Sequence, residues 1–377
     1  MTRRERLMAT LEGRPVDRPA VNFYEIGGFK VDPSDGDSFN IYNDPSWRPL
    51  LELAERETDV IRMREPVVTP TAANNAAEFF EEETWHEGAS RFTRTTLSAG
   101  GRKMTSLARR DAAVDTVWEV EHLLKDVDDL KVYLTLPDEA FEYDVDVSNL
   151  IAEDSRAGDA GIVMVDFADP ICHAASLFSM ADYTVVAFTE QALFHALLDK
   201  WAKPLTERAL EIAAAFPGRL WRIVGPEYAT PPYLPPSLFE EYVVRYTGPI
   251  VRAVEATGGF ARVHCHGRIR EVLPMIASMG PTGIDPIEPP PQGDVDLAWV
   301  RKEYGKDLVL FGNVEVSDIE TLPPKEFERK CRRSLDDGTS GTGRGFVLMP
   351  TACPYGRKIS DNVLENYRTM VGLAKSV

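Results

Sequence analysis

Two of the six histidines in this chain, His264 and His266, lie one residue apart in the segment Phe-Ala-Arg-Val-His-Cys-His-Gly. The apolar character of this segment predicts a β-strand, in which successive side chains point to opposite faces. His264 and His266 then point to one side and Cys265 to the other. Two imidazoles placed in this way can chelate one metal ion. By this spacing alone, a pair of buried, hydrogen-bonded histidines is at least as common.

A sulfur ligand for the same ion is available near the end of the chain. Cys353 follows the last long apolar segment, within Thr-Ala-Cys-Pro-Tyr-Gly. Three protein ligands of nitrogen and sulfur type that leave a fourth position open are typical of catalytic zinc. The residue types are therefore consistent with a Zn²⁺ site made of His264, His266 and Cys353, and two structural histidines remain the alternative.

The elements that would position these side chains are short apolar runs separated by helical patterns. Near-continuous apolar strands that alternate with helices predict a parallel sheet covered on both faces, and eight of them predict a closed (β/α)8 TIM barrel. We expect one such domain over residues 1–377. The eight runs are Ala20–Ile26, Asp59–Glu65, Gly161–Phe167, Leu220–Pro226, Ala261–Gly267, Gly283–Pro289, Leu308–Val314 and Phe346–Ala352.

One stretch interrupts this alternation, from about residue 78 to residue 120. Its segments Arg91–Thr96 and Val114–Val120 alternate in the manner of strands, and Ser-Ala-Gly-Gly supplies turn residues between two of the segments. We expect an antiparallel hairpin or a three-stranded β insertion between barrel strands two and three. It could cap the barrel mouth or form the interface of a homodimer.

Polar residues follow most of the predicted strands, at the end where active sites of such barrels lie. Two glutamates are candidates for an additional metal ligand, or for holding an imidazole by its free N–H. Four further residues are candidates for binding substrate. For each of these residues, a solvated strand end is the alternative interpretation. The two glutamates are Glu227 and Glu288, and the substrate-binding candidates are Glu25, Asp166, Asn313 and Tyr355.

Composition argues against several classes of partner. The chain has 60 acidic and 42 basic residues and a net charge of −18, which repels nucleic acid and anionic membranes. No run of about 18 apolar residues occurs, so no membrane span is expected. The basic N-terminal segment is followed by no apolar signal core, which leads us to expect a cytoplasmic protein. The four cysteines are too few and too scattered for a disulfide framework.

From about Pro19 to its end, the chain resembles the uroporphyrinogen decarboxylase superfamily of barrels. The segments that carry the likeness include Arg-Val-His-Cys-His-Gly, Asp-Pro-Ile-Glu-Pro-Pro and Leu-Phe-Gly-Asn-Val-Glu. The chain is most similar to the branch of zinc-dependent, corrinoid-linked methyltransferases. That branch includes methylcobamide:coenzyme M methyltransferases and enzymes of O-demethylation in one-carbon metabolism. Its zinc ligands are a His, a Cys two residues on and a distant Cys, which the resemblance maps onto His264, His266 and Cys353.

The second mapped ligand departs from the branch, because His266 stands where those methyltransferases carry cysteine. An imidazole in place of a thiolate leaves a bound zinc ion more electrophilic, which suits an ether oxygen better than a thiol. The resemblance implies transfer of a methyl group between a corrinoid (methylcobalamin) and a small-molecule thiol or methoxy substrate. It also implies that the corrinoid arrives on a separate corrinoid protein.

Two other functions stay open at this point. One is a uroporphyrinogen-decarboxylase-like lyase or decarboxylase that acts on a small acid without a corrinoid. Uroporphyrinogen itself is disfavoured, because Val21–Phe29 carries a carboxylate and no arginine where a substrate with eight carboxylates needs cations. The other is a non-catalytic binding subunit of a methyltransferase complex.

Overall fold

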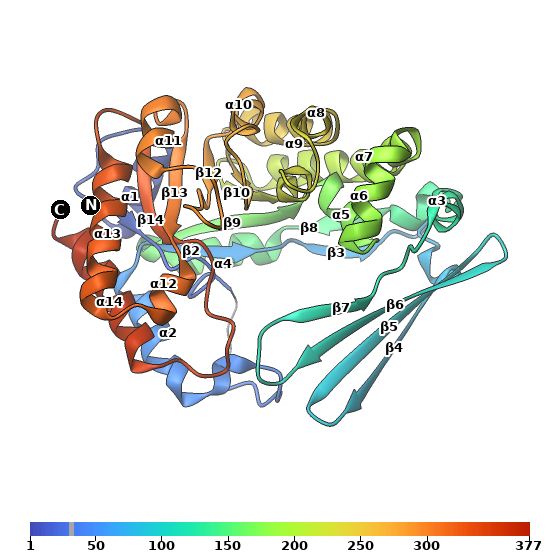
Figure 1. The fold of residues 1–377 in the computed structure, drawn as a ribbon, viewed down its shortest axis with the longest axis horizontal. Coiled ribbons are helices and arrows are strands. Elements are labelled where there is room, and N and C mark those ends of the chain that lie inside the picture. The colour runs from blue at the N-terminus through green and yellow to red at the C-terminus, as the bar shows by residue number, and fades with distance from the viewer. Residues whose placement is uncertain (30–33) are drawn as a thin grey trace.

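Eight parallel strands form the central sheet of the computed structural model, which describes residues 1–29 and 34–377 (Figure 1). The strands follow one another in the order β1-β14-β13-β12-β11-β10-β9-β2. Each lies largely within one of the eight predicted apolar runs, so the predicted (β/α)8 barrel is confirmed. Their bounds are β1 Ala20–Val21, β2 Val60–Arg64, β9 Gly161–Ala168, β10 Leu220–Val224, β11 Phe260–His264, β12 Gly283–Asp285, β13 Val309–Val314 and β14 Gly345–Pro350.

The two ends of this order, β1 and β2, meet at a short seam. The Asp59 N–H donates to the Val21 carbonyl at 2.7 Å. The Asp59 carboxylate is fully buried and accepts from Arg6 at 2.6 Å, Arg18 at 2.8 Å and the Val21 N–H at 2.9 Å. Burying a charge is favourable only when it is paired and hydrogen-bonded, so these bonds hold the N-terminal helix against the seam.

Helices surround the barrel and connect its strands (Figure 1). Alternate strand residues point inward or outward, so two hydrophobic clusters form. One fills the barrel and includes Ile61, Met164 and Phe311, and the other lies mainly between strands and helices. The helices are α1 Arg3–Leu11, α2 Arg48–Glu57, α3 Val127–Leu134, α4 Ser148–Ala157, α5 Pro170–Ser176, α6 Met180–Thr189, α7 Gln191–Ala215, α8 Pro236–Phe239, α9 Arg245–Ala256, α10 Leu273–Ser278, α11 Leu297–Tyr304, α12 Val316–Thr321, α13 Pro324–Thr339 and α14 Asp361–Lys375.

A four-stranded antiparallel sheet is inserted between β2 and β9, at the predicted place. It consists of β4 Phe80–Glu87, β5 Ser90–Ala99, β6 Arg102–Asp111 and β7 Val117–Glu121. The sequence predicts two or three strands here. It misses β4 because Phe-Glu-Glu-Glu-Thr-Trp-His-Glu is acidic and mostly exposed, and so lacks an apolar alternation. The short strands β3 Val67–Pro70 and β8 Tyr143–Asp146 pair where the insertion leaves and rejoins the barrel.

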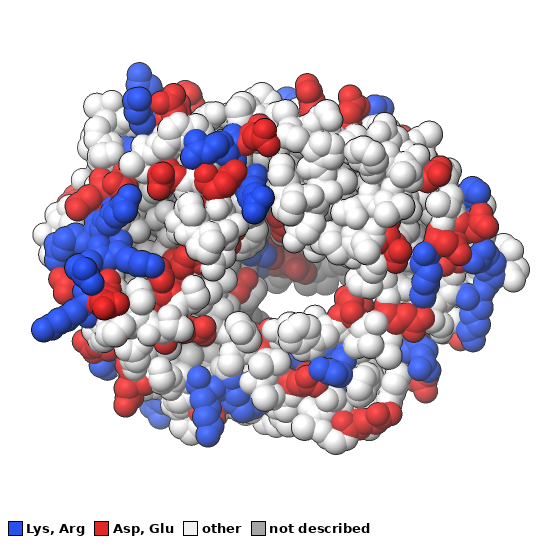
Figure 2. All heavy atoms as spheres, viewed as in Figure 1, with Lys and Arg blue, Asp and Glu red and all other residues white. Residues whose placement is uncertain are grey.

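The inserted sheet projects from the barrel, with β7 nearest to it and β4 farthest away (Figure 1). Figure 2 shows an opening between the barrel and this sheet, with acidic side chains around it and few basic ones. Within the described part of the chain, no helix is both long and apolar enough to cross a membrane.

Candidate functional site

The end of β11 brings the two histidines together. The strand ends at His264, and Cys265 and His266 continue its alternation. The two imidazole centroids lie 4.6 Å apart and the rings are nearly perpendicular, at 84°. His264 is buried, whereas the His266 side chain is 37% exposed and so reaches the barrel mouth. Cys265 is buried in the hydrophobic cluster outside the barrel, on the opposite side from the histidines.

Each imidazole is held by a carboxylate. His264 Nδ1 lies 2.8 Å from Asp285 Oδ2, and His266 Nδ1 lies 2.7 Å from Glu288 Oε1. Because an ionised carboxylate only accepts, each Nδ1 donates its hydrogen, and in the neutral imidazole Nε2 is the nitrogen that carries the lone pair. Among the residues that the structure describes, none is hydrogen-bonded to either Nε2. A carboxylate on the far nitrogen is the arrangement that orients histidine for a metal or for proton transfer.

The charges of these pairs shift the pKa values of their members. Burial lowers the pKa of His266, but the hydrogen bond and charge of Glu288 outweigh it, so the pKa is raised. Burial raises the pKa of Asp285, but the charges of Arg262 and His264 outweigh it, so the pKa is lowered. Burial also raises the pKa of Glu288, but the hydrogen bond and charge of His266 outweigh it, so this pKa is lowered too. Both carboxylates therefore stay ionised and hold the rings in place.

Two arginines inside the barrel complete a polar network beneath the histidines. Arg262 Nε lies 2.9 Å from Asp285 Oδ1, and both side chains are buried. Arg222 Nε and Nη2 donate to the two carboxylate oxygens of Asp166 at 2.7 and 3.0 Å. The strand register aligns Asp166, Arg222 and Arg262 side by side on β9, β10 and β11.

Sequence reasoning misses Arg222 and Tyr24 as parts of this network. Arg222 Nη1 donates to the Tyr24 hydroxyl, which lies 3.5 Å from His264 Nδ1. Arg222 lies in the apolar run Leu-Trp-Arg-Ile-Val, and a charge at such a position needs a partner. That rule could have found Arg222. Tyr24 gives no comparable signal, because its role depends on contacts with other strands.

Cys353 lies close to Glu25 rather than in a cluster with both imidazoles. Its Sγ donates to Glu25 Oε2 at 2.8 Å, and burial and the Glu25 charge raise the pKa of the thiol well above its usual value. Within residues 1–29 and 34–377, no group of three or more His, Cys, Asp or Glu side chains is arranged to hold a metal ion. The imidazoles have donor atoms that fit zinc, but the structure does not gather the third predicted ligand with them.

The remaining predicted site residues have varied surroundings. Asp166 pairs with Arg222, as described above. Glu227 Oε2 accepts from the Gly225 N–H at 3.0 Å rather than from an imidazole. Asn313 is buried, and its Oδ1 has no hydrogen-bond partner among the described residues. Tyr355 is 55% exposed, and its carbonyl accepts from Asp115 of the insertion at 2.8 Å.

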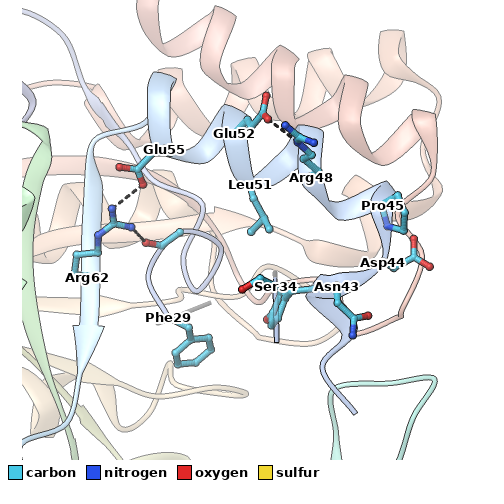
Figure 3. A pocket seen from close by; sticks show the side chains of 12 residues that line it. Phe29, Ser34, Asn43, Asp44, Pro45, Arg48, Leu51, Glu52, Glu55 and Arg62 are labelled. Atoms are coloured by element: carbon cyan, nitrogen blue, oxygen red, sulfur yellow. Dashed lines mark hydrogen bonds and ion pairs between the residues drawn. The ribbon is translucent and has the colours of Figure 1, made fainter. Parts of the chain in front are cut away.

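A separate cavity of about 670 Å³ lies beside α2 (Figure 3). Four of its five charged side chains pair with one another, and Asp44 accepts from the Ser46 N–H at 3.0 Å and the Ser46 hydroxyl at 2.7 Å. Arg48 Nε lies 3.0 Å from Glu52 Oε1, and Arg62 Nη2 lies 2.6 Å from Glu55 Oε2. Of the described residues that line it, none is a predicted site residue. With its charges satisfied internally, this cavity indicates no ligand.

The fold and the site together define a (β/α)8 barrel with histidines and carboxylates at the carboxyl ends of its strands. Residues 118–375 match the family model described as uroporphyrinogen decarboxylase (URO-D). The chain belongs to this family. The match includes the histidine segment, β9 to β14 and Cys353, but not β1, β2 or most of the insertion. Comparison with curated proteins gave no match.

One solved structure shares the fold, and a second is more distantly similar. A methyltransferase from Methanosarcina mazei is 16% identical, with a TM-score of 0.60, and the likeness covers 100% of this chain and 99% of that one. A B12-independent methionine synthase from Shewanella sp. W3-18-1 is 14% identical, with a TM-score of 0.39, over 75% of this chain and 74% of that one. At these identities the likeness concerns the fold alone, and the second is too distant to carry an argument.

Proposed function

We propose that this protein is a methyltransferase that moves a methyl group between a corrinoid and a small-molecule thiol or methoxy substrate. The observation that carries the proposal is the pair of adjacent imidazoles at the barrel mouth, each held by a carboxylate with its Nε2 free. The fold shared with the methyltransferase from Methanosarcina mazei supports it. A corrinoid protein that docks over the mouth is part of the proposal.

Zinc held by His264, His266 and Cys353 is also part of the proposal. When bound, it would supply a Lewis acid for the substrate heteroatom, and two imidazoles with one thiolate would suit an ether oxygen. Cys353 would have to give up its hydrogen bond to Glu25 to serve as a ligand. Metal analysis of the purified protein tests this part independently of activity.

The residues of the chain act by positioning and by controlling charge, which is what an in-line methyl transfer requires. Asp285 and Glu288 fix the orientation of the two imidazoles. Glu288 also accepts from the Gly267 N–H at 2.7 Å, so its carboxylate is held from two sides. We assign the Asn313 Oδ1 atom, which has no hydrogen-bond partner in the described part of the chain, to a donor on the substrate.

The alternative of a decarboxylase that acts on a small acid finds less support at the mouth. A carboxylate substrate is bound most strongly by a free cation, and Arg222 and Arg262 are already paired with Asp166 and Asp285. A non-catalytic binding subunit is the other alternative. Such a subunit would bind no metal and would leave the absorption spectrum of the corrinoid unchanged.

Visible absorption of the corrinoid distinguishes these functions. We expect methylcobalamin to be demethylated in the presence of the protein and a thiol, or cob(I)alamin to be methylated with a methoxy-arene donor. Either reaction changes the cobalt spectrum. Absence of any spectral change with these substrates would contradict the proposal, and release of carbon dioxide from a small acid without corrinoid would establish the alternative.

A further inference from the structure

A cavity of about 440 Å³ lies at the amino ends of β1 and β14, opposite the mouth that carries the histidines. Its walls come from the loop between α1 and β1, from α11, and from the segment between α13 and β14. Both chain termini lie at this end of the molecule (Figure 1). Residues at this end of such barrels normally serve stability, so an unsatisfied polar group here calls for an explanation.

Arg301 of α11 is such a group. The residue is 7% exposed, yet its guanidinium forms no ion pair with a carboxylate of the described chain. Its Nε donates to the Ser340 carbonyl at 3.0 Å, and its Nη1 is buried without a hydrogen-bond partner. The Gly343 backbone packs directly on the guanidinium, where a Cβ would come within 2.4 Å of Cζ. A buried charge without a counter-ion is costly, and burial alone lowers the pKa of Arg301.

Arg344 lines the same cavity and also lacks an ion-pair partner in the described chain. Its Nη2 donates to the Leu11 carbonyl at 2.8 Å, its Nε is buried without a partner, and it forms no ion pair within the described residues. Asp17 also lines the cavity, but its carboxylate is taken by Arg6 at 2.7 Å and by the terminal ammonium at 3.2 Å. Val377 lines the cavity as well, but no ion pair in the described part of the chain joins it to either arginine. Within the described residues, the cavity therefore holds two guanidinium groups without an ion-pair partner.

We propose that this cavity binds a small oxyanion, a phosphorylated or carboxylated molecule, between Arg301 and Arg344. Guanidinium groups pair with carboxylate and phosphate oxygens through charged, often bidentate hydrogen bonds. The net charge of −18 repels anions from most of the surface. Two arginines without an ion-pair partner among the described residues make this cavity locally positive, so an anion can bind there. The site is separate from the barrel mouth, so it is independent of the proposed methyl transfer.

Thermal unfolding and titration calorimetry of the whole protein, at constant ionic strength set with chloride, test this site. The probes are inorganic phosphate and succinate, which separate the two ligand sources. We expect at least one of them to raise the melting temperature saturably, because a ligand that binds only the folded state stabilises it. Loss of one charged hydrogen-bond donor weakens binding about tenfold, so Arg301→Gln and Arg344→Gln should each abolish most of the rise.

The matched control is Arg329→Gln, which removes the same charge from an exposed position of α13 that does not line the cavity. This variant should respond to the probes as the wild type does. Arg344→Gln also serves as the second variant if Arg301→Gln folds poorly. Absence of a saturable rise in the wild type with both probes, or an equal rise in all variants, overturns the proposal.

Discussion

His266 is the residue on which the proposed chemistry depends most. Its ring is more exposed than that of His264, its Nδ1 is committed to Glu288 at 2.7 Å, and its Nε2 faces no partner among the described residues. Cys265 is its immediate neighbour but is buried on the opposite side. The two positions therefore form a matched pair, one in the site and one outside it.

The proposed zinc site predicts that His266→Ala loses metal binding and methyl transfer together, because one of the two proposed nitrogen ligands is removed. Cys265→Ala should keep both and lose only about 1 kcal/mol of unfolding free energy, as small truncations in a core do. Elemental analysis, the corrinoid assay and urea unfolding measure these effects. Equal loss of metal in both variants would show that the assignment of the two faces is wrong.

Asp169 provides a pH-dependent contribution to stability at the residue scale. It is fully buried after β9, its Oδ1 accepts from the Cys172 N–H at 2.9 Å, and its Oδ2 accepts from Thr247 at 2.6 Å. Burial raises its pKa from 3.8 to about 7. The folded state therefore favours the protonated acid, and the unfolded state releases the proton at a lower pH.

A raised pKa in the folded state means that this stabilisation is complete below pH 3.8 and is lost as the pH rises through about 7. Asn resembles the protonated acid and does not titrate. We expect the unfolding free energy of the wild type to fall relative to Asp169→Asn between pH 4 and pH 8, by up to about 4 kcal/mol. Urea unfolding at several pH values measures the difference, and a constant difference across this range would contradict the assigned pKa.

At the scale of elements, the turn after β10 packs very closely against the start of α5. Gly225 has a φ of +136°, a conformation that L side chains rarely adopt. A Cβ at this position would lie 1.9 Å from Asp169 Oδ1 and 2.8 Å from Cys172 Cβ. The Gly225 N–H also binds Glu227. Glycine here lets the end of β10 pack against the start of α5.

Gly225→Ala should therefore destabilise the protein by about 2–5 kcal/mol, through backbone strain and overpacking together. The control is Gly372→Ala in α14, where a Cβ meets nothing within 4 Å. That change should be neutral or stabilising by up to about 1 kcal/mol, because alanine favours helix more than glycine. Chemical unfolding compares the two, and similar effects would contradict the packing at Gly225.

At the scale of the whole molecule, a few side-chain contacts join the inserted sheet to the barrel. Arg357, four residues after Cys353, makes several of the connections. Its Nε donates to the Ala112 carbonyl of the insertion at 2.6 Å, and its Nη1 donates to Asn43 Oδ1 at 3.0 Å. Its Nη2 donates to the Ser38 carbonyl. One side chain thus links the insertion, the segment before α2 and the loop that carries Cys353.

We expect Arg357→Ala to lower the unfolding free energy by about 2–3 kcal/mol, because several bonds of a charged donor are lost. Amide hydrogen exchange should speed up in residues 112–116 and 353–359 while the barrel strands stay protected. Lys358→Ala, at an exposed neighbouring position, is the control and should change neither. Unchanged exchange in Arg357→Ala would show that the insertion is held by other contacts.

The insertion also exposes apolar side chains on β7, namely Val117, Trp118 and Val120. Exposed apolar patches often mark association surfaces. A homodimer formed through this sheet therefore stays a prediction, which sedimentation of the purified protein would test.

Local pattern in the sequence was enough to place all eight barrel strands, because each is a short apolar run covered on both faces and flanked by turn or helix residues. The two-residue period of a strand also placed His264 and His266 together and Cys265 apart. These features depend on neighbouring residues only. The acidic strand β4 was not predicted, because its mostly exposed residues show no two-residue alternation of apolar and polar side chains.

The sequence named Glu288 as a candidate for holding an imidazole, but only the tertiary structure decided which carboxylate meets which ring. Asp285 and Glu288 reach the imidazoles because β12 lies beside β11, and Cys353 bonds Glu25 because β14 lies beside β1. Within the described residues, Arg301 forms no ion pair where the α11 and α13 regions meet, and no local pattern foretells that. Pairings between residues so distant in the chain follow from strand register and packing. A local sequence pattern determines neither the register nor the packing.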